Sequence, residues 1–280
     1  MTPVADGVVA EVERPAAAAA AVASHRTEPL LAVEEVSVAF GGLRAVDRLS
    51  FEVDPGTIVG LIGPNGAGKS TALKIIGGEV RPTSGRVRFD GTDLVGTAPH
   101  EAARRGLVRT FQLGGEFGRL TVMENLLVAV PGMKGQSLLG ALAGKRFWRA
   151  SQDAEVRRAR DILSGLQLRD KEDAYASDLS GGQRKLVEIA RALMARPKML
   201  LLDEPMAGVN RSLARRIEET LSSLRAEGIA LLLVEHELGS VERLCERVVV
   251  MASGSKIAEG DMSEVRSRDD VLSAYLGRRR

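Results

Sequence analysis

The stretch Gly63 to Ser70 reads G-P-N-G-A-G-K-S and has the residue types and spacing of a phosphate-binding loop. Glycines let backbone N–H groups turn inward without a side chain in the way. Lys69 supplies a point charge for the β- and γ-phosphates, and the Ser70 hydroxyl is suited to Mg²⁺. We therefore expect a nucleotide to be held by Gly63, Pro64, Asn65, Gly66, Ala67, Gly68, Lys69, Ser70 and Thr71.

Two carboxylates, Asp203 and Glu204, directly follow the apolar run Met199–Leu202. Such a run is typical of a strand inside a parallel sheet, and ligands bind at the carboxyl ends of these strands. Asp203 can bind Mg²⁺, and Glu204 can orient or deprotonate an attacking water. The alternative is a pair of surface acids; the phosphate loop upstream favours chemistry.

Polar residues at two further places could reach the same phosphates. His236 follows the next apolar run, Ala230–Val234, which places it toward the γ-phosphate. Ser180-Gly181-Gly182-Gln183 has the spacing of a capping box at the start of a helix. Two glycines in a first turn cost helix stability, which makes sense if that turn must approach a phosphate closely. Alone, this second pattern is a weak signal.

The surrounding elements must position these residues. A strand at 57–62 and a helix at 70–76 flank the phosphate loop, and further apolar strands alternate with helices, which predicts an α/β fold. Thr121 and Glu124 form a capping-box pattern that opens a helix through Val130. Phe40 ends the first strand, where it could stack on an adenine ring or be a core or turn-edge residue; its own pattern favours the core or turn edge.

Composition narrows the function classes. The 280 residues allow one large domain or two small ones, and 3% aromatic residues argue against a surface that stacks single-stranded nucleic acid. Residues 1–28 are alanine-rich without a positive leader, so we expect a disordered tail, and residues 278–280 are a solvated basic tail. Residues 137–150 form a basic amphipathic stretch that suits a membrane, a partner helix or a plain surface helix.

The order of these motifs resembles that of the ATP-binding subunit of ABC transporters, from about Leu30 to Gly277. The resemblance implies one ABC ATPase domain over 29–277: a P-loop NTPase with a RecA-like core, an antiparallel β subdomain and a helical subdomain at about 113–180. It implies that Phe40 stacks on adenine, that Gln112 contacts Mg²⁺ and couples to the membrane subunit, and that Glu204 and His236 serve catalysis. Residues 179–183 match the signature motif and Asn210 lies in the D-loop match.

Five segments resemble the ATPase subunits of branched-chain amino-acid importers: 38–43, 108–112, 124–129, the insertion through Trp148, and 274–277. That resemblance implies an ATPase on the cytoplasmic face of the membrane, with transmembrane permeases, a second ABC ATPase in a homo- or heterodimer, an extracytoplasmic solute-binding protein and no nucleic acid. ATP would lie between 63–71 of one subunit and Ser180, Gly181, Gly182, Gln183 and Asn210 of the other. A urea or amide importer, a lipid exporter and a soluble ABC ATPase are the alternatives.

Overall fold

Two sheets organise the chain, in a computed structural model that describes residues 28–110, 118–131 and 145–276. Residues 1–27 of the predicted tail, Gln112 and residues 137–144 of the basic stretch fall outside these residues, and the side chains of residues 145–150 are not described. Among the described residues, no helix is both long and apolar enough to cross a membrane.

The smaller sheet is antiparallel, with strand order β2-β1-β4-β5. Its strands are β1 (Leu31–Phe40), β2 (Leu43–Val53), β4 (Ser84–Phe89) and β5 (Thr92–Asp93). Along β1, Val33, Val36 and Val38 are buried while the intervening side chains are more exposed, with register shifts between these positions. This near-alternation is what a half-buried strand requires, as the sequence predicts.

The larger sheet has the order β10-β9-β3-β8-β7-β6 and is parallel except for the β9–β10 pair. Its strands are β3 (Ile58–Ile62), β6 (Leu107–Arg109), β7 (Met199–Asp203), β8 (Ala230–Val234), β9 (Arg247–Ala252) and β10 (Ser255–Gly260). Every residue of β3 and β8 is buried, because helices or the other sheet cover both faces. The carboxyl ends of β3, β7 and β8 therefore meet at one edge.

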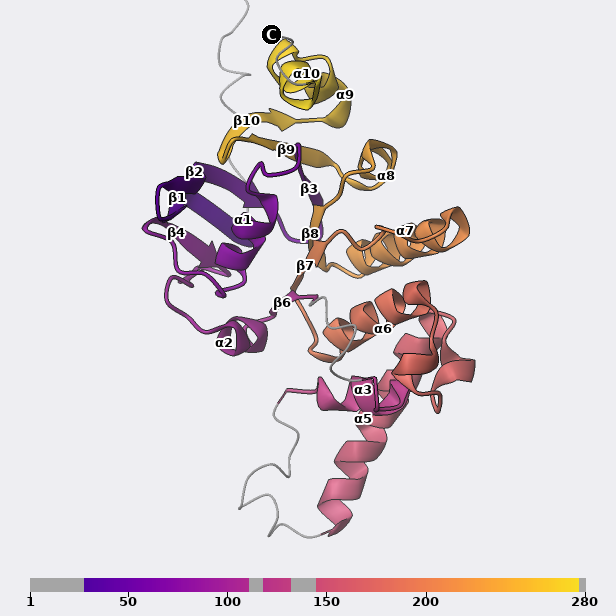
Figure 1. The fold of residues 1–280 in the computed structure, drawn as a ribbon. Helices are drawn as coiled ribbons and strands as arrows, with labels where there is room; N and C mark the ends of the chain where they lie inside the picture. The colour runs from indigo at the N-terminus through magenta and orange to yellow at the C-terminus, as the bar shows by residue number, and fades with distance from the viewer. Residues whose placement is uncertain (1–27, 111–117, 132–144, 277–280) are drawn as a thin grey trace, which may run out of the picture.

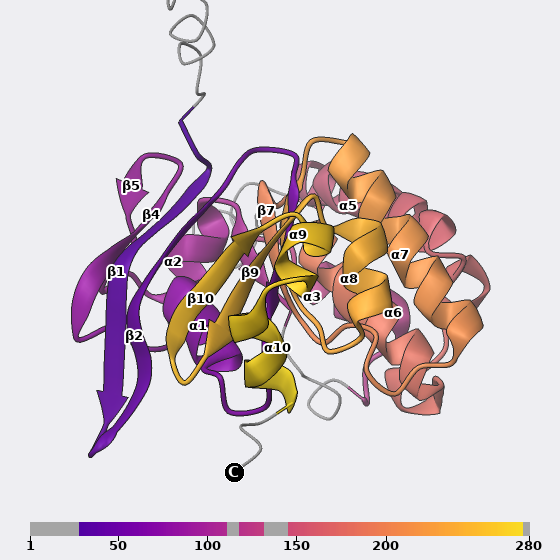
Figure 2. The ribbon, with the colours of Figure 1, turned by 90° about the horizontal axis from the view of Figure 1, so that it is seen from above.

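Helices cover the larger sheet on both sides (Figure 1). Helix α1 (Lys69–Ile76) packs with the antiparallel sheet in one hydrophobic cluster, and α6 (Gly181–Met194) and α7 (Arg211–Ala226) pack in a second cluster with β7 and β8. Figure 2 shows the antiparallel sheet on one side of the parallel strands and α5 to α8 on the other. The remaining helices are α2 (Pro99–Arg104), α3 (Val122–Val128), α5 (Lys145–Gly165), α8 (Leu238–Leu244), α9 (Met262–Arg266) and α10 (Asp269–Leu276), with 3₁₀ turns at Arg169–Lys171 and Ala176–Asp178.

Both predicted capping boxes are present. Thr121 and Glu124 cap α3, and Ser180 and Gln183 cap α6, each through reciprocal side-chain and backbone hydrogen bonds. Helix α3 ends at Val128, two residues before the predicted end. These caps satisfy backbone donors that a helix start leaves open and so fix where both helices begin.

Cys245, the single cysteine of the chain, directly follows α8. A β-carbon on Gly60 of β3 would lie only 3.0 Å from the Cys245 sulfur, so strand and thiol are in close contact. Burial raises the pKa of Cys245 to about 12. The thiol is therefore a packed core group rather than a reactive one.

Candidate nucleotide-hydrolysing site

The phosphate loop connects β3 to α1, as the sequence predicts. Gly66 and Gly68 have φ angles of 78° and 101°, in the left-handed region that favours glycine. At Gly68 a β-carbon would lie 2.4 Å from the Ala45 carbonyl oxygen, whereas at Gly66 it would meet nothing within 4 Å. The loop is thus held tightly at its base and open where a phosphate would enter.

Lys69 lies almost fully buried at the start of α1. Its Nζ donates to the carbonyl oxygens of Gly63 at 2.8 Å and Pro64 at 3.1 Å. Burial lowers the pKa of this ammonium, while the negative charges of Glu204 and Asp203 raise it. The ammonium therefore sits inside the loop, beside the two carboxylates.

The oxygen atoms that fit Mg²⁺ lie beside the loop. Ser70 Oγ is 3.5 Å from one oxygen of Asp203, and the other Asp203 oxygen accepts a hydrogen bond from Arg109 at 3.0 Å. Arg109 also pairs with Glu79 at 2.6 Å. A hydroxyl and a single carboxylate, with further oxygens from phosphates, form the ligand set that Mg²⁺ prefers in nucleotide sites, so these residues fit the ion.

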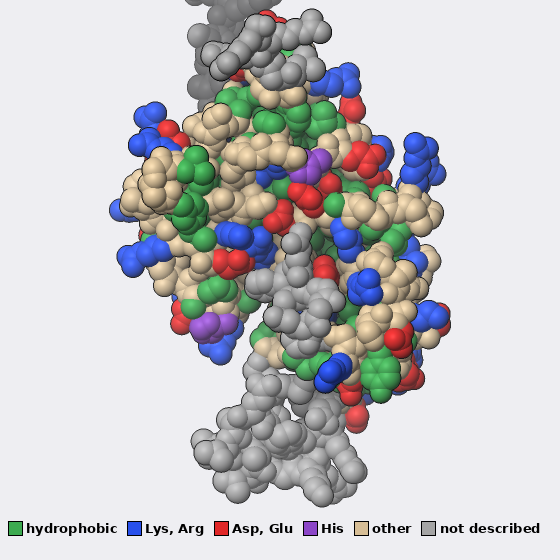
Figure 3. Space-filling model, viewed as in Figure 1, with side chains coloured by type: hydrophobic (Ala, Val, Ile, Leu, Met, Phe, Trp, Pro, Cys, Tyr) green, Lys and Arg blue, Asp and Glu red, His purple; other side chains and the backbone are tan. Residues whose placement is uncertain are grey.

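Glu204 and His236 form the second half of the site. Glu204 Oε1 lies 2.6 Å from His236 Nε2, and both side chains are partly exposed. Glu204 has a φ angle of 51°, which is unusual for a residue with a side chain and costs on the order of 1–3 kcal/mol. Figure 3 shows a histidine and several acidic side chains gathered in the middle of one face.

Neighbouring groups hold this strained backbone. Glu204 N–H donates to the Val234 carbonyl oxygen at 2.9 Å, and Lys185 Nζ donates to the Glu204 carbonyl oxygen at 2.9 Å. Buried Glu235 accepts from the backbone N–H of Met206 at 2.8 Å, and burial raises the pKa of Glu235. The turn after β7 is therefore fixed by contacts from β8 and α6.

The signature residues lie close by in the same chain. Ser180 caps α6, and Gly182 packs against α7, where a β-carbon would lie 1.7 Å from Leu213 Cδ2. A β-carbon on Gly181 would instead meet open space. Asn210 caps α7 by accepting from the Leu213 N–H at 3.0 Å. Close packing against Leu213 of the same chain therefore favours glycine at position 182.

The contacts described above include neither Phe40 nor Gln112. Phe40 is 53% exposed at the end of β1, so the core alternative for it is wrong, and its stacking on adenine stays a prediction. Gln112 lies outside the described residues. Conversely, Arg109 and Lys185 contact Asp203 and Glu204. The sequence pattern does not predict these contacts, because a charged residue at a strand end or on a helix is usually solvated.

Tyr275 of α10 also reaches the phosphate loop, through a hydrogen bond with the Gly63 backbone. Burial raises the pKa of this tyrosine, and the hydrogen bond opposes that shift. The carboxyl-terminal helix therefore contacts the first residue of the loop.

A glycine loop between a strand and a helix, with carboxylates at the end of β7, defines a P-loop nucleotide hydrolase. The profile of the family described as "ABC transporter" matches residues 46–207. More than half of the chain is matched, and the chain therefore belongs to the ABC transporter family, as an ATP-binding subunit and an ATPase.

Two curated relatives cover nearly the whole chain. A probable branched-chain amino acid transport ATP-binding protein LivG of Archaeoglobus fulgidus is 40% identical over 89% of this chain and 95% of its own. The high-affinity branched-chain amino acid transport ATP-binding protein BraF of Pseudomonas aeruginosa is 36% identical over 90% and 99%.

Two solved structures have the same fold. A nucleotide-free ATP-binding cassette from an ABC transporter matches with a TM-score of 0.78 and 39% identity, over 89% of this chain and 99% of its own. The ADP conformation of such a cassette matches with a TM-score of 0.78 and 38% identity, over 90% and 100%. The predicted α/β, P-loop NTPase fold is confirmed.

Proposed function

We propose that this chain hydrolyses ATP to drive the import of branched-chain or related amino acids through partner permeases. The geometry of Glu204 and His236 beside the phosphate loop supports the hydrolytic part. The names of the relatives support the solute class, since both are called branched-chain amino acid transport proteins. The subunit would act at the cytoplasmic face of the membrane.

In this proposal, each described residue has a role that its position supports. The loop N–H groups and Lys69 bind the phosphates. Ser70 and Asp203 would hold Mg²⁺, with Gln112 as the further ligand that the family resemblance implies, and the ion would offset negative charge on the phosphates. Glu204 accepts a proton from, or orients, the attacking water, and His236 lies within hydrogen-bond distance of Glu204 and steadies it. Catalysis is therefore positioning and charge stabilisation, without a covalent intermediate on the protein.

The proposal includes a head-to-tail dimer. Ser180, Gly181, Gly182, Gln183 and Asn210 of one subunit would complete the ATP site of the other. The exposed positions of Ser180, Gly181 and Asn210 support this role, because a second subunit can reach them. The two subunits can be identical or different, and an extracytoplasmic binding protein would deliver the solute.

Replacing Glu204 tests the hydrolytic role. Glu204→Gln keeps the size of the side chain and removes the base, so we expect nucleotide binding to persist while kcat falls at least about a hundredfold. Nucleotide titration and phosphate release measure the two effects separately. Glu237→Gln is the matched control, because it removes an acid one residue from His236 and should leave kcat near its normal value. Rapid turnover by Glu204→Gln would show that another residue is the base.

Isolation of the complex from native membranes tests the transport role. Mild detergent followed by mass spectrometry should recover permeases with several membrane spans, a second ATPase subunit where the dimer is mixed, and a solute-binding protein. The ligand of that binding protein identifies the solute; urea or a short amide would replace the amino-acid assignment. Recovery of soluble partners alone would reject transport and leave the ATPase chemistry standing.

A further inference from the structure

Lys185 leaves the second turn of α6 and reaches the turn that follows β7. Its Nζ donates to two backbone carbonyl oxygens, those of Glu204 at 2.9 Å and Ala207 at 2.6 Å. Among the described residues, no carboxylate lies within ion-pair distance of this ammonium. Because this partly buried ammonium hydrogen-bonds to carbonyl oxygens and not to a carboxylate, its position depends on the position of the backbone turn that it contacts.

The backbone that Lys185 contacts is the strained one. Glu204 holds a left-handed φ of 51° and precedes Pro205, although a residue before proline is normally driven to an extended conformation. Such a conformation persists only where the surroundings impose it. Its N–H is tied to Val234 of β8, and its carbonyl oxygen accepts from both Ala207 N–H and Lys185. The hydrogen bond from Lys185 is the contact that α6 makes with the Glu204 carbonyl oxygen.

Packing leaves room beside this contact. A cavity of about 270 Å³ lies against the turn and is lined by Lys185, Glu204 and Glu188, among others. A larger cavity of about 760 Å³ lies farther out between α5, α6 and α7. Because the smaller cavity lies between α6 and the turn, apolar packing there is incomplete, and a polar contact has more weight in setting where the turn lies.

Acidic groups from two elements face the same ammonium. The charge of Lys185 acts on Glu188 of α6 and on Glu235 after β8, both of which have a pKa raised by burial. Glu235 in turn accepts from Met206 N–H, inside the turn that Lys185 binds. Removing the ammonium would therefore remove the contact of α6 with the turn, and with it a positive charge that acts on both acids.

We propose that Lys185 is a positioning residue: it holds Glu204 in its strained conformation and links this residue to α6. This inference rests on the proposed role of Glu204. The same helix begins at Ser180–Gln183, the segment proposed to contact the partner subunit's ATP. A shift of α6 when it contacts that ATP would displace the carbonyl oxygens of Glu204 and Ala207. ATP bound at one site of a dimer would therefore affect Glu204 at the other site.

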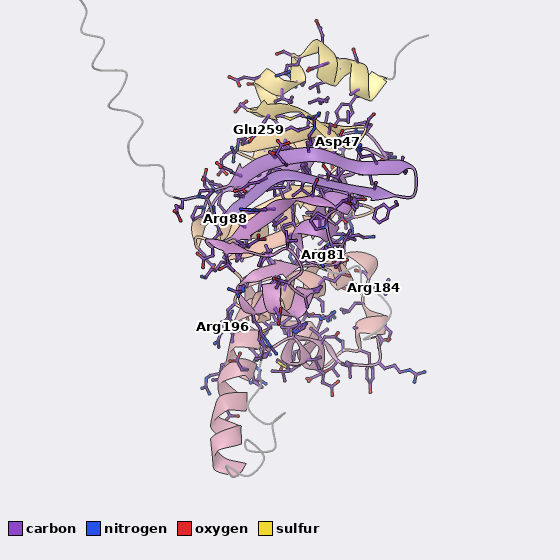
Figure 4. All side chains as sticks on the ribbon, turned by 90° about the vertical axis from the view of Figure 1, so that its left-hand side faces the viewer. Asp47, Arg81, Arg88, Arg184, Arg196 and Glu259 are labelled. Atoms are coloured by element: carbon purple, nitrogen blue, oxygen red, sulfur yellow. The ribbon has the colours of Figure 1, made fainter. Side chains whose placement is uncertain are left out.

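The chain offers a matched control at the adjacent position. Arg184 also donates to two carbonyl oxygens, Leu179 at 2.9 Å and Ser177 at 3.5 Å, but both lie in the segment before α6. Figure 4 shows Arg184 and Arg196 on opposite sides of the view; Arg184 lies in the first turn of α6 and Arg196 lies just beyond the end of this helix. Lys185→Gln and Arg184→Gln thus remove the same charge from the same helix, and only the first cuts the link to Glu204.

The test compares kcat, nucleotide affinity and the Hill coefficient of the full-length protein. We expect Lys185→Gln to lower kcat at least about tenfold, to change the Kd for ATP less than about twofold, and to bring the Hill coefficient close to one. Lys185→Arg keeps the cation and should recover most of the lost kcat. Arg184→Gln should keep both kcat and the Hill coefficient. Assays run well below each variant's Tm separate positioning from lost stability.

Three outcomes overturn the inference: normal kcat and cooperativity in Lys185→Gln, an equal loss in Arg184→Gln, or no recovery in Lys185→Arg. Glu204→Gln separates this failure from that of the proposed function. An inactive Glu204→Gln with a fully active Lys185→Gln rejects only the role of Lys185. A fully active Glu204→Gln rejects the role of Glu204, and with it the inference.

Discussion

At the scale of single residues, the ammonium of Lys69 is the charge closest to the phosphate loop. It hydrogen-bonds with Gly63 and Pro64 of that loop and is nearly inaccessible to solvent. A desolvated cation attracts phosphate strongly, because little water screens it. The loop is therefore prepared for an anion before one arrives.

Lys69→Ala tests this preparation. We expect the affinity for ATP to fall at least about tenfold, because a charge-assisted contact with the phosphates is lost. Titration with a fluorescent nucleotide measures the change. Lys74→Ala is the control: Lys74 lies on the same helix with its side chain exposed, and its loss should leave affinity unchanged. Equal affinities of wild type and Lys69→Ala would count against the loop as the phosphate site.

Spacing in the sequence predicts which residues carry chemistry better than it predicts how they are held. Lys69, Asp203 and His236 follow from motif and strand pattern alone. The left-handed conformation of Glu204 does not, since a glutamate before a proline carries no local signal for it. That conformation depends on Val234 and Lys185, which are distant in the sequence and adjacent only in the fold.

At the scale of elements, the first turns of α6 and α7 pack against one another. Gly182 of α6 abuts Leu213 of α7, whereas Gly181 beside it faces open space. The two glycines therefore serve different physical purposes, although the motif presents them as a pair. One permits helix packing and the other leaves the surface of the motif accessible.

Alanine at each glycine separates the two purposes. Gly181→Ala should be neutral or stabilise by up to about 1 kcal/mol, since alanine favours a helix. Gly182→Ala should destabilise by about 1–3 kcal/mol, because Leu213 must move. Urea unfolding measures both. Adding Leu213→Ala should remove the penalty of Gly182→Ala, and a penalty that persists in the double variant would show that the Leu213 contact is not its cause.

Element types follow from the sequence more readily than element limits and order. Strand β2 begins at Leu43, but its first half contains charged Arg44, Asp47 and Arg48 and therefore lacks the apolar pattern of a strand; this half pairs with β1 through an irregular register. The capping boxes of α3 and α6 were predictable because they are local. The order β10-β9-β3-β8-β7-β6 was not predictable from patterns, because strand pairing joins residues far apart in the chain.

At the scale of the whole molecule, the partly buried thiol of Cys245 links stability to pH. The folded thiol has a pKa of about 12, whereas an unfolded thiol ionises near about 8.5. Between these values only the unfolded state releases the proton, so stability falls as pH rises through this window. Cys245→Ser should flatten this part of the stability curve, which equilibrium urea unfolding at several pH values would measure. An unchanged slope would show that other groups cause it.

Because Cys245 lies close to Gly60, the rate at which a thiol reagent labels this cysteine can report movement of β3. The partly buried sulfur lies against the strand that leads into the phosphate loop, three residues before Gly63, so opening of that strand would make the sulfur more accessible to a thiol reagent. ATP would slow the labelling in wild type but not in Lys69→Ala. Labelling of this one native cysteine can therefore report the opening of the nucleotide site without an engineered residue.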